Sequence, residues 1–168
     1  VSQVAREHRL RTALEEYLAT TEDRLDFVLI DCPPSLGLLT INAFTAAGEL
    51  MIPIQCEYYA LEGLSQLLGS IRMIQKHLNP ALHLSTILLT MYDGRTRLAQ
   101  QVADEVRAHF PNEVLHTVIP RSVRVSEAPS FGQTVIAYDG QSVGAVSYRE
   151  AAVELVHRQQ SATKEGAL

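Results

Sequence analysis

A carboxylate stands at the end of a short apolar run, where it could take part in phosphate or metal chemistry. Leu25 and residues 27–30 are branched or aromatic, which predicts a buried strand, and Asp31 follows directly. Pro33 and Pro34 then stop the strand, because proline has no N–H to donate. The carboxyl ends of parallel strands line the crevice where open α/β sheets bind ligands. Asp31 is therefore a candidate site residue, although a strand that simply ends in a polar turn has the same pattern.

Two arginines form a second candidate group, because both follow predicted strands in loops. The planar guanidinium groups of Arg95 and Arg124 suit two-point contact with a phosphate, although solvated surface arginines would show the same pattern. Over residues 94–126 five arginines oppose three acidic residues, but one residue more at each end adds Asp93 and Glu127 and removes the excess. The formal net charge of the chain is −5. Charge alone therefore does not establish nucleic-acid binding.

Strands and helices alternate along the chain around these residues. Apolar runs predict strands, and apolar residues that recur at helical spacing predict helices. The predicted strands cover 25–30, 50–54, 84–91 and 114–118, and the predicted helices cover 2–19, a segment capped by Ser35 or Thr40 that ends near Ala47, 61–78, 96–110 and 148–159. This alternation predicts an α/β fold with a doubly wound parallel sheet and right-handed crossovers. Residues 126–145 are predicted to form a long surface connection.

The length and composition fit one domain over residues 1–168, with residues 161–168 as a disordered tail. Of the 168 residues 46% are apolar, which is enough for a core. No apolar run is long enough to span a bilayer and no signal peptide heads the chain, so we expect a cytoplasmic protein without membrane contact. Cys32 and Cys56 lack CxxC spacing, and the histidines form no i, i+4 pair beside a carboxylate. No transition-metal site is predicted.

Four strings of residues carry a family resemblance. In one-letter code they are DCPPSLGLLT at 31–40, IPIQCEYYALEG at 52–63, LTMYDGRT at 89–96 and VIPRSVRVSEAP at 118–129. In type, order and spacing they resemble the ParA/Soj chromosome- and plasmid-partitioning ATPases, a deviant-Walker-A group that also contains MinD. The resemblance covers about residues 10–156. It implies a P-loop NTPase fold, in which the apolar run before Asp31 is the Walker B strand.

One defining element of that family does not occur in the sequence. The chain has no Gly-rich phosphate loop with a lysine, and its two lysines are Lys76 and Lys164. It begins with Val1, in what resembles the helix before the Walker B strand. The sequence is thus interpreted as the C-terminal part of a partition ATPase, with the N-terminal P-loop strand missing. The parent family hydrolyses ATP, but we do not expect this chain to do so alone.

The resemblance implies roles for the residues that follow the Walker B strand. Asp31 would be the catalytic carboxylate that holds Mg²⁺, through a water molecule, beside the phosphates of ATP. Pro33, Pro34 and Gly37 resemble the switch that responds to nucleotide state, and the alternative is that they only shape a turn. Cys32 is expected to be a packing residue, since nothing near it in the sequence would lower its pKa.

The resemblance also implies two groups of residues later in the chain. Met91, Pro120 and Arg121 would flank the adenine base, with apolar faces stacked on it; packing alone is the alternative. Arg95 and Arg124 would bind DNA phosphates without reading base sequence.

In the intact protein, the resemblance implies that ATP and Mg²⁺ assemble a homodimer that binds nucleoid DNA nonspecifically. A ParB-type partner would stimulate hydrolysis and release the DNA. The alternative is a truncated, non-enzymatic paralogue that acts as a dimerisation or DNA-binding module, because loss of a central strand exposes sheet edges and apolar surface. A MinD-like membrane-positioning ATPase fits poorly, since the tail 161–168 is short and weakly apolar.

Overall fold

The computed structural model of the protein describes residues 6–33 and 35–165, with side chains as far as Gln160. The chain divides into two compact units whose segments alternate along the sequence. Residues 1–50 and 66–83 form unit 1, and residues 51–65 and 84–168 form unit 2. The single domain over 1–168 stays a prediction.

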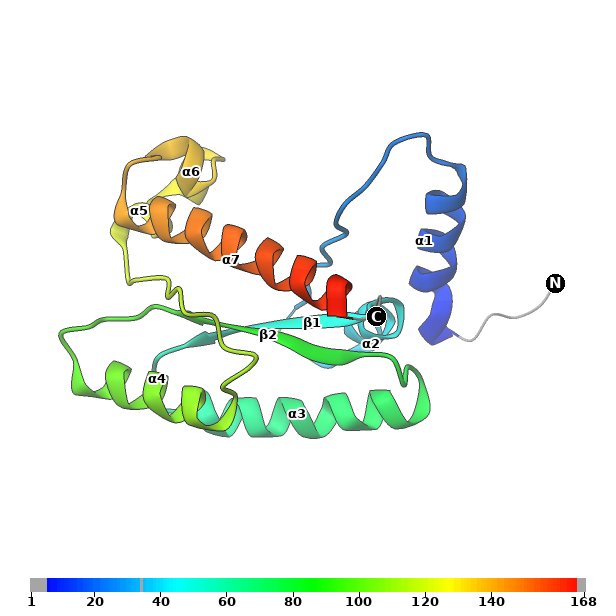
Figure 1. Ribbon diagram of the computed structural model, residues 1–168, viewed down its shortest axis with the longest axis horizontal. Helices are drawn as coiled ribbons and strands as arrows, with labels where there is room; N and C mark the ends of the chain where they lie inside the picture. The colour runs from blue at the N-terminus through cyan, green and yellow to red at the C-terminus, as the bar shows by residue number, and fades with distance from the viewer. Residues whose placement is uncertain (1–5, 34, 166–168) are drawn as a thin grey trace. The chain divides into compact units, whose positions relative to one another are not determined.

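Each predicted helix and two of the predicted strands have a counterpart in the described residues (Figure 1). No helix among them is both long and apolar enough to cross a membrane. The elements in chain order are η1 (Arg6–His8), α1 (Arg9–Thr20), α2 (Leu38–Ala46), β1 (Glu49–Gln55), α3 (Ala60–His77), β2 (His83–Thr90), α4 (Arg97–His109), α5 (Val123–Glu127), η2 (Ala128–Phe131), α6 (Val135–Tyr138) and α7 (Val143–Glu165).

In unit 1, α2 packs against η1 and α1. Asn42 of α2 joins the three elements, because its side-chain Nδ2 donates to the carbonyl oxygen of Arg6 at 2.9 Å and its Oδ1 accepts the Leu10 N–H at 3.2 Å. Residues 2–5 of the predicted first helix lie outside the described residues, and the rest of that prediction is confirmed.

Asn79 closes the C-terminal end of α2 from the segment that follows α3. Its side-chain Nδ2 donates to the carbonyl oxygens of Phe44, Thr45 and Ala47 at 2.9, 3.2 and 2.7 Å. The last carbonyls of a helix have no partner within the helix, and here one amide, only 2% exposed, supplies it. Asn79 thus ties residues 66–83 to residues 1–50 within unit 1.

The strand predicted over Leu25 and residues 27–30 is wrong: this segment forms no strand. Leu29 is 78% exposed and Phe27 46% exposed. A strand needs a neighbour to pair with its N–H and C=O groups, and the sheet of the described residues contains β1 and β2 only. An apolar run was enough to predict burial, but burial as a strand also requires that partner.

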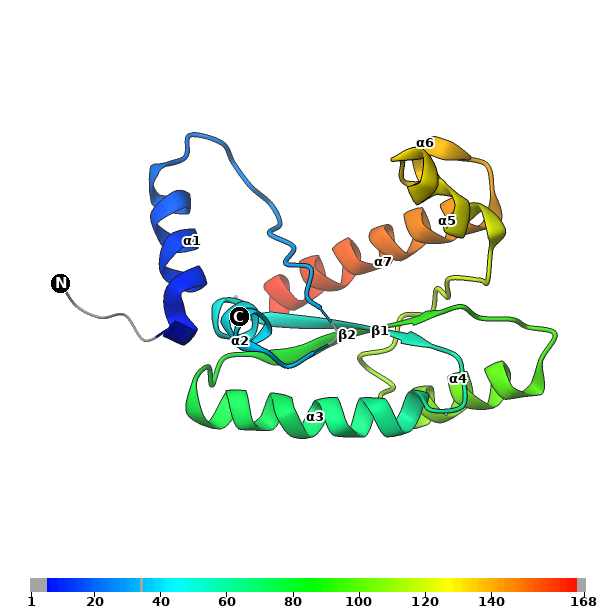
Figure 2. The ribbon, with the colours of Figure 1, turned by 180° about the vertical axis from the view of Figure 1, so that it is seen from behind.

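The parallel strands β1 and β2 lie at the centre of unit 2, to which all their residues except 49, 50 and 83 belong (Figure 1). Seen from the opposite side in Figure 2, α4 covers one face of this sheet and α7 the other. Leu88, Leu115, Ile119 and Ala151 form a core cluster between the sheet and α7. β1 contains Pro53, which has no N–H to donate to a neighbouring strand.

The strand predicted over 114–118 is broken into two parallel bridges to β2 and its end, Ile87 with Val114 and Tyr92 with Pro120. Leu115 N–H donates to the Ile87 carbonyl at 2.9 Å, but the next bond to β2 comes from Ile119, to the Leu89 carbonyl at 2.8 Å. Residues 116–118 therefore bulge away from the sheet, which explains why the prediction of one continuous strand is wrong.

The long surface connection predicted over 126–145 is also wrong, because the short elements α5, η2 and α6 form within or across its start. Ala128, Val135 and Ala145 build a second core cluster there. At Gly144 a Cβ atom would lie 2.5 Å from Val125 Cγ2, so the close approach of α7 to α5 requires glycine. α7 starts before the predicted residue 148 and continues to Glu165; residues 166–168 of the predicted disordered tail lie outside the described residues.

Candidate functional site

Asp31 lies in unit 1, in the extended segment before α2, and lines an open pocket of about 510 Å³ together with Arg6 and Arg9. Its side chain is exposed and makes no hydrogen bond or ion pair within the described residues. It is therefore free to accept hydrogen bonds from a hydrated cation. Mg²⁺ keeps several waters and is usually held by one or two carboxylates together with substrate phosphates. Asp31 fits that role, and no group of three or more potential ligands occurs among the described residues.

Cys32 beside it is a poor nucleophile. Its partial burial and, to a lesser extent, the Asp31 charge raise the pKa of the Cys32 thiol. A thiol with a raised pKa stays protonated at neutral pH, and the thiolate is the reactive form. This supports the prediction that Cys32 is a packing residue.

The predicted switch residues flank the start of α2. Pro33 is exposed, Gly37 occupies the N-cap position of α2, and Pro34 lies outside the described residues. The predicted cap by Ser35 or Thr40 is wrong, since no side chain caps this helix. The Thr40 hydroxyl instead donates back to the Ser35 carbonyl oxygen at 2.7 Å.

In unit 2 the structure brings Met91, Pro120 and Arg121 together at the carboxyl end of β2. Tyr92 N–H donates to the Ile119 carbonyl at 3.1 Å, and Arg121 N–H donates to the Tyr92 carbonyl at 3.0 Å. Met91 has φ of 53°, a conformation uncommon outside glycine. Such strained positions concentrate at ligand sites.

Glu57 belongs to the same edge and was left out of the predicted site. Arg121 Nη2 donates to Glu57 Oε1 at 3.0 Å, and both side chains are more than half exposed. An exposed pair of this kind contributes only about 0–1 kcal/mol to stability, so its importance lies in holding Arg121 in place. The sequence signal that could have found Glu57 is its position just after β1, at the same end of the sheet as Met91.

The side chain of Arg95 is held by a carboxylate of its own loop, that of Asp93. Its Nε and Nη2 donate to the two carboxylate oxygens of Asp93, each at 2.9 Å, and its backbone N–H donates to Oδ1 at 3.1 Å. The side chain is 89% exposed. The hydrogen bonds from Arg95, first of all those of its side chain, lower the pKa of Asp93 to about 2.

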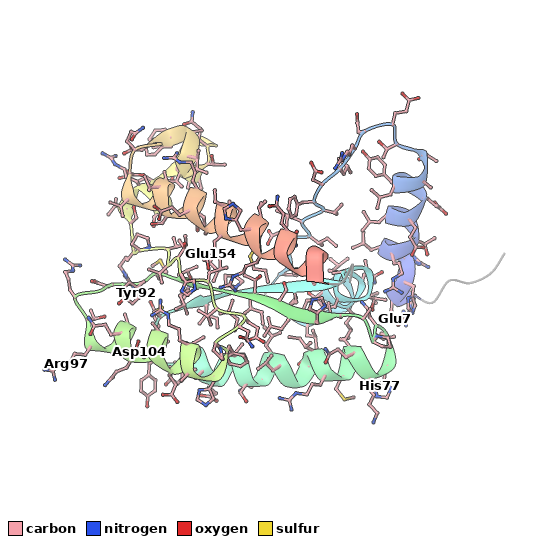
Figure 3. The ribbon with its side chains drawn as sticks, viewed as in Figure 1. Glu7, His77, Tyr92, Arg97, Asp104 and Glu154 are labelled. Carbon is pink, nitrogen blue, oxygen red and sulfur yellow. The ribbon has the colours of Figure 1, made fainter. Side chains whose placement is uncertain are left out.

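We expect the Asp93 carboxyl to titrate at about 2 in a ¹³C NMR experiment on the folded protein. This pKa lies below the ordinary aspartate value of ~3.9. The stabilisation that the Arg95 contact gives to the folded state is therefore present at pH values above ~3.9 and is lost as the pH falls through about 2. Arg95→Ala should move the midpoint of the Asp93 titration up toward ~3.9. Arg97→Ala is the control and should leave that midpoint unchanged, because the Arg97 side chain is exposed and points outward in Figure 3. A wild-type midpoint near ~3.9 would contradict the pairing.

Arg124 is also bound by acidic neighbours. Its Nη1 lies 3.1 Å from Glu127 Oε2 and its Nε lies 3.3 Å from Asp139 Oδ2. The Glu127 hydrogen bond and charge, followed by Tyr138, raise the pKa of Arg124. The two predicted DNA-binding arginines are therefore partly neutralised by Asp93, Glu127 and Asp139.

Comparison with known proteins shows which proteins the chain is similar to. A family model described as an AAA domain matches residues 2–84. The sporulation initiation inhibitor protein Soj of Bacillus subtilis is 54% identical over 155 residues, which are 92% of this chain and 60% of that protein. The chromosome partitioning protein ParA of Myxococcus xanthus is 51% identical over 158 residues, which are 94% of this chain and 54% of that protein. Over more than nine-tenths of its length, this chain is homologous to the ParA/Soj proteins.

The chain spans little more than half the length of these two relatives. A solved structure of cobyrinic acid a,c-diamide synthase from Mycobacterium smegmatis, with bound ADP and magnesium, matches it with a TM-score of 0.74 and 35% identity, over 96% of this chain and 57% of that one. The likeness to solved structures confirms the predicted fold class, an α/β fold of the P-loop NTPase type with a parallel sheet.

Proposed function

We propose that the full-length gene product is a ParA/Soj-type partitioning ATPase, in which ATP and Mg²⁺ assemble a homodimer that binds nucleoid DNA nonspecifically. A ParB-type partner stimulates hydrolysis, and the protein acts in the cytoplasm. The observation that carries the proposal is the identity of 51–54%, over more than nine-tenths of the chain, to Soj and ParA proteins. Because the chain spans 54–60% of their length, this activity is proposed for the whole protein.

Asp31 is the proposed catalytic carboxylate. Its unengaged oxygens would hold the hydrated cation by accepting hydrogen bonds from its water ligands. When bound, Mg²⁺ would supply positive charge that offsets the charge on the phosphate oxygens. Pro33, Pro34 and Gly37 connect Asp31 to α2, which is the basis for proposing them as the nucleotide switch.

Met91, Pro120 and Arg121 are proposed to hold the adenine base. The apolar Met91 side chain and Pro120 ring offer stacking surfaces, while backbone groups at the end of β2 are placed to read the base edge. Glu57 fixes the Arg121 side chain through the ion pair of 3.0 Å.

Arg95 and Arg124 are the proposed DNA contacts. The two bonds from Arg95 to Asp93 occupy its Nε and Nη2, so its Nη1 remains for a phosphate. The carboxylates beside both arginines reduce the local positive charge, and we therefore expect weak binding that depends on dimer assembly and low salt.

The experiment is DNA binding by the full-length protein, measured with ATP, with ADP and without nucleotide over a range of salt concentrations. We expect binding with ATP only. Arg95→Ala with Arg124→Ala should weaken it and reduce the slope of log K against log salt by roughly 0.9 for each phosphate that the variant no longer binds. Arg72→Ala is the matched control, because Arg72 is an exposed arginine on α3 of unit 1.

DNA binding that is independent of nucleotide would contradict the proposed ATP-dependent dimer. Binding that requires ATP but is unchanged in the double variant, or falls equally in Arg72→Ala, would leave the ATPase proposal standing and refute the assignment of Arg95 and Arg124.

A second candidate function is a non-enzymatic dimerisation or DNA-binding module. The observation that favours it is the exposed apolar surface of unit 1, where Leu29 and Leu39 are 78% and 77% exposed. Self-association of the full-length protein without nucleotide, combined with no ATP hydrolysis, would favour this module over the ATPase.

A further inference from the structure

Two side chains of α7 hold the segment that leads to the predicted base site. The Glu154 carboxylate accepts the backbone N–H groups of His116 and Thr117 at 2.7 and 2.9 Å. Arg158, one turn further along α7, donates to the carbonyl oxygens of Asn112, Glu113 and Val114 at 3.0, 3.0 and 2.6 Å. Figure 3 labels Glu154 on α7 and Tyr92 at the end of β2. We call Glu154 and Arg158 the α7 clamp.

The Glu154 carboxylate of the α7 clamp satisfies a backbone N–H group, that of Thr117, which the bulge of residues 116–118 removes from the sheet. In a regular parallel ladder Thr117 N–H would bond to the Leu89 carbonyl, because Leu115 N–H bonds to Ile87 two residues earlier. The Leu89 carbonyl instead receives the N–H of Ile119 at 2.8 Å. The Glu154 carboxylate is thus the replacement acceptor, and it makes the bulge a stable path of the chain.

The charges of the α7 clamp are matched. Glu154 Oε1 lies 3.0 Å from Arg158 Nη2, and the two side chains are 17% and 27% exposed. Burial raises the pKa of Glu154, but the hydrogen bonds from Thr117 and His116 and the Arg158 charge outweigh it, so the pKa lies below its ordinary value. Glu154 therefore remains charged at neutral pH, and charged acceptors make the stronger hydrogen bonds.

The bulge determines where the chain returns to β2. After it, Ile119 bonds to Leu89, Tyr92 bonds to Ile119, and Arg121 bonds to Tyr92. Without the bulge, Thr117 would take the place of Ile119, and residues other than Pro120 and Arg121 would lie at the end of β2. The packing of Ala151, one turn before Glu154, against Leu115 and Ile119 keeps α7 over this path.

We propose that Glu154 and Arg158 are positioning residues for nucleobase selection: by holding residues 112–117 in the bulged path, they place Pro120 and Arg121 beside Met91. The inference rests on the proposed function, since it takes a purine nucleotide as the ligand. Neither residue touches the base itself. Selection of adenine over guanine therefore depends on a carboxylate of α7.

The test is Glu154→Gln in the full-length protein, with affinities for ATP and for GTP measured by competition in the presence of Mg²⁺. Glutamine keeps the size of the side chain but offers only one carbonyl oxygen to two N–H groups. We expect ATP affinity to fall about tenfold, the effect of ~1.4 kcal/mol, with GTP affinity little changed. Amide hydrogen exchange of His116 and Thr117 should become faster. Glu150→Gln, an exposed glutamate on the same helix, is the matched control.

The outcomes separate this inference from the proposed function. Wild-type protein that binds neither nucleotide would refute the proposed function. Wild-type protein that binds both without preference would overturn the inference alone, as would an equal loss for ATP and GTP in Glu154→Gln, which is what a merely structural role predicts. A loss of preference confined to Glu154→Gln and absent from Glu150→Gln would support it.

Discussion

Replacing Asn79 by aspartate is expected to lower the free energy of unfolding by about 3 kcal/mol or more. The Asn79 amide donates to three carbonyl oxygens at the end of α2 and is 2% exposed. Aspartate has the same shape but would place a carboxylate against those carbonyls, leave them without a donor and bury its own charge. Urea denaturation followed by circular dichroism measures the change.

The control for this prediction is Asn112→Asp, the same substitution at an exposed position. The side chain of Asn112 is not used in the α7 clamp, which binds its backbone carbonyl. We expect the control to remain within ~0.5 kcal/mol of wild type. A similar small change in Asn79→Asp would mean that the amide does not close α2, and that other contacts hold residues 66–83 in unit 1.

Asp31→Asn in the full-length protein is expected to reduce ATP hydrolysis by about 10–100-fold, the usual effect of losing a group that acts on a metal through its water shell. Asparagine keeps the size of the side chain and one acceptor oxygen, but removes the charge that attracts Mg²⁺. ATP binding should persist, since the proposed base contacts are Met91, Pro120 and Arg121, which this variant leaves unchanged. Single-turnover hydrolysis and calorimetric ATP binding, both with Mg²⁺, separate the two effects.

Asp26→Asn is the matched control, because Asp26 lies in the same segment and makes an exposed ion pair with Arg24 at 3.5 Å. It should hydrolyse ATP at the wild-type rate. If Asp31→Asn did so as well, the carboxylate at the end of this segment would not be the catalytic one, and the Walker B assignment would be wrong.

Local pattern was sufficient for the long helices and for two strands. The spacing of apolar residues predicted a helix over 61–78, and α3 is Ala60–His77; the runs at 50–54 and 84–91 became β1 and β2. Pattern failed at 25–30, where strand formation depends on a neighbour that the described residues do not contain. It also failed at 116–118, because the partly buried glutamate that accepts the backbone N–H groups of this segment is 37–38 residues away in the sequence.

The candidate site was predicted from the resemblance, and the structure adds how its charges are arranged. The sequence already showed that Asp93 and Glu127, just outside the window 94–126, cancel its positive excess. The structure shows that these two carboxylates bind the two arginines of interest, Arg95 and Arg124. A count of charges could not reveal this pairing, because it depends on the turn after β2 and on the helical spacing of α5.

Pro53 disfavours the addition of a strand from another molecule at the edge of β1. Cys56 N–H donates to the Thr90 carbonyl of β2, so by alternation along the strand the Pro53 nitrogen faces the opposite edge, which has no partner strand within the described residues. An added strand at that edge would find a missing donor in the middle of the ladder. We therefore expect Pro53 to disfavour the addition of strands at β1 in concentrated solutions, and a residue with an N–H at this position to remove that effect.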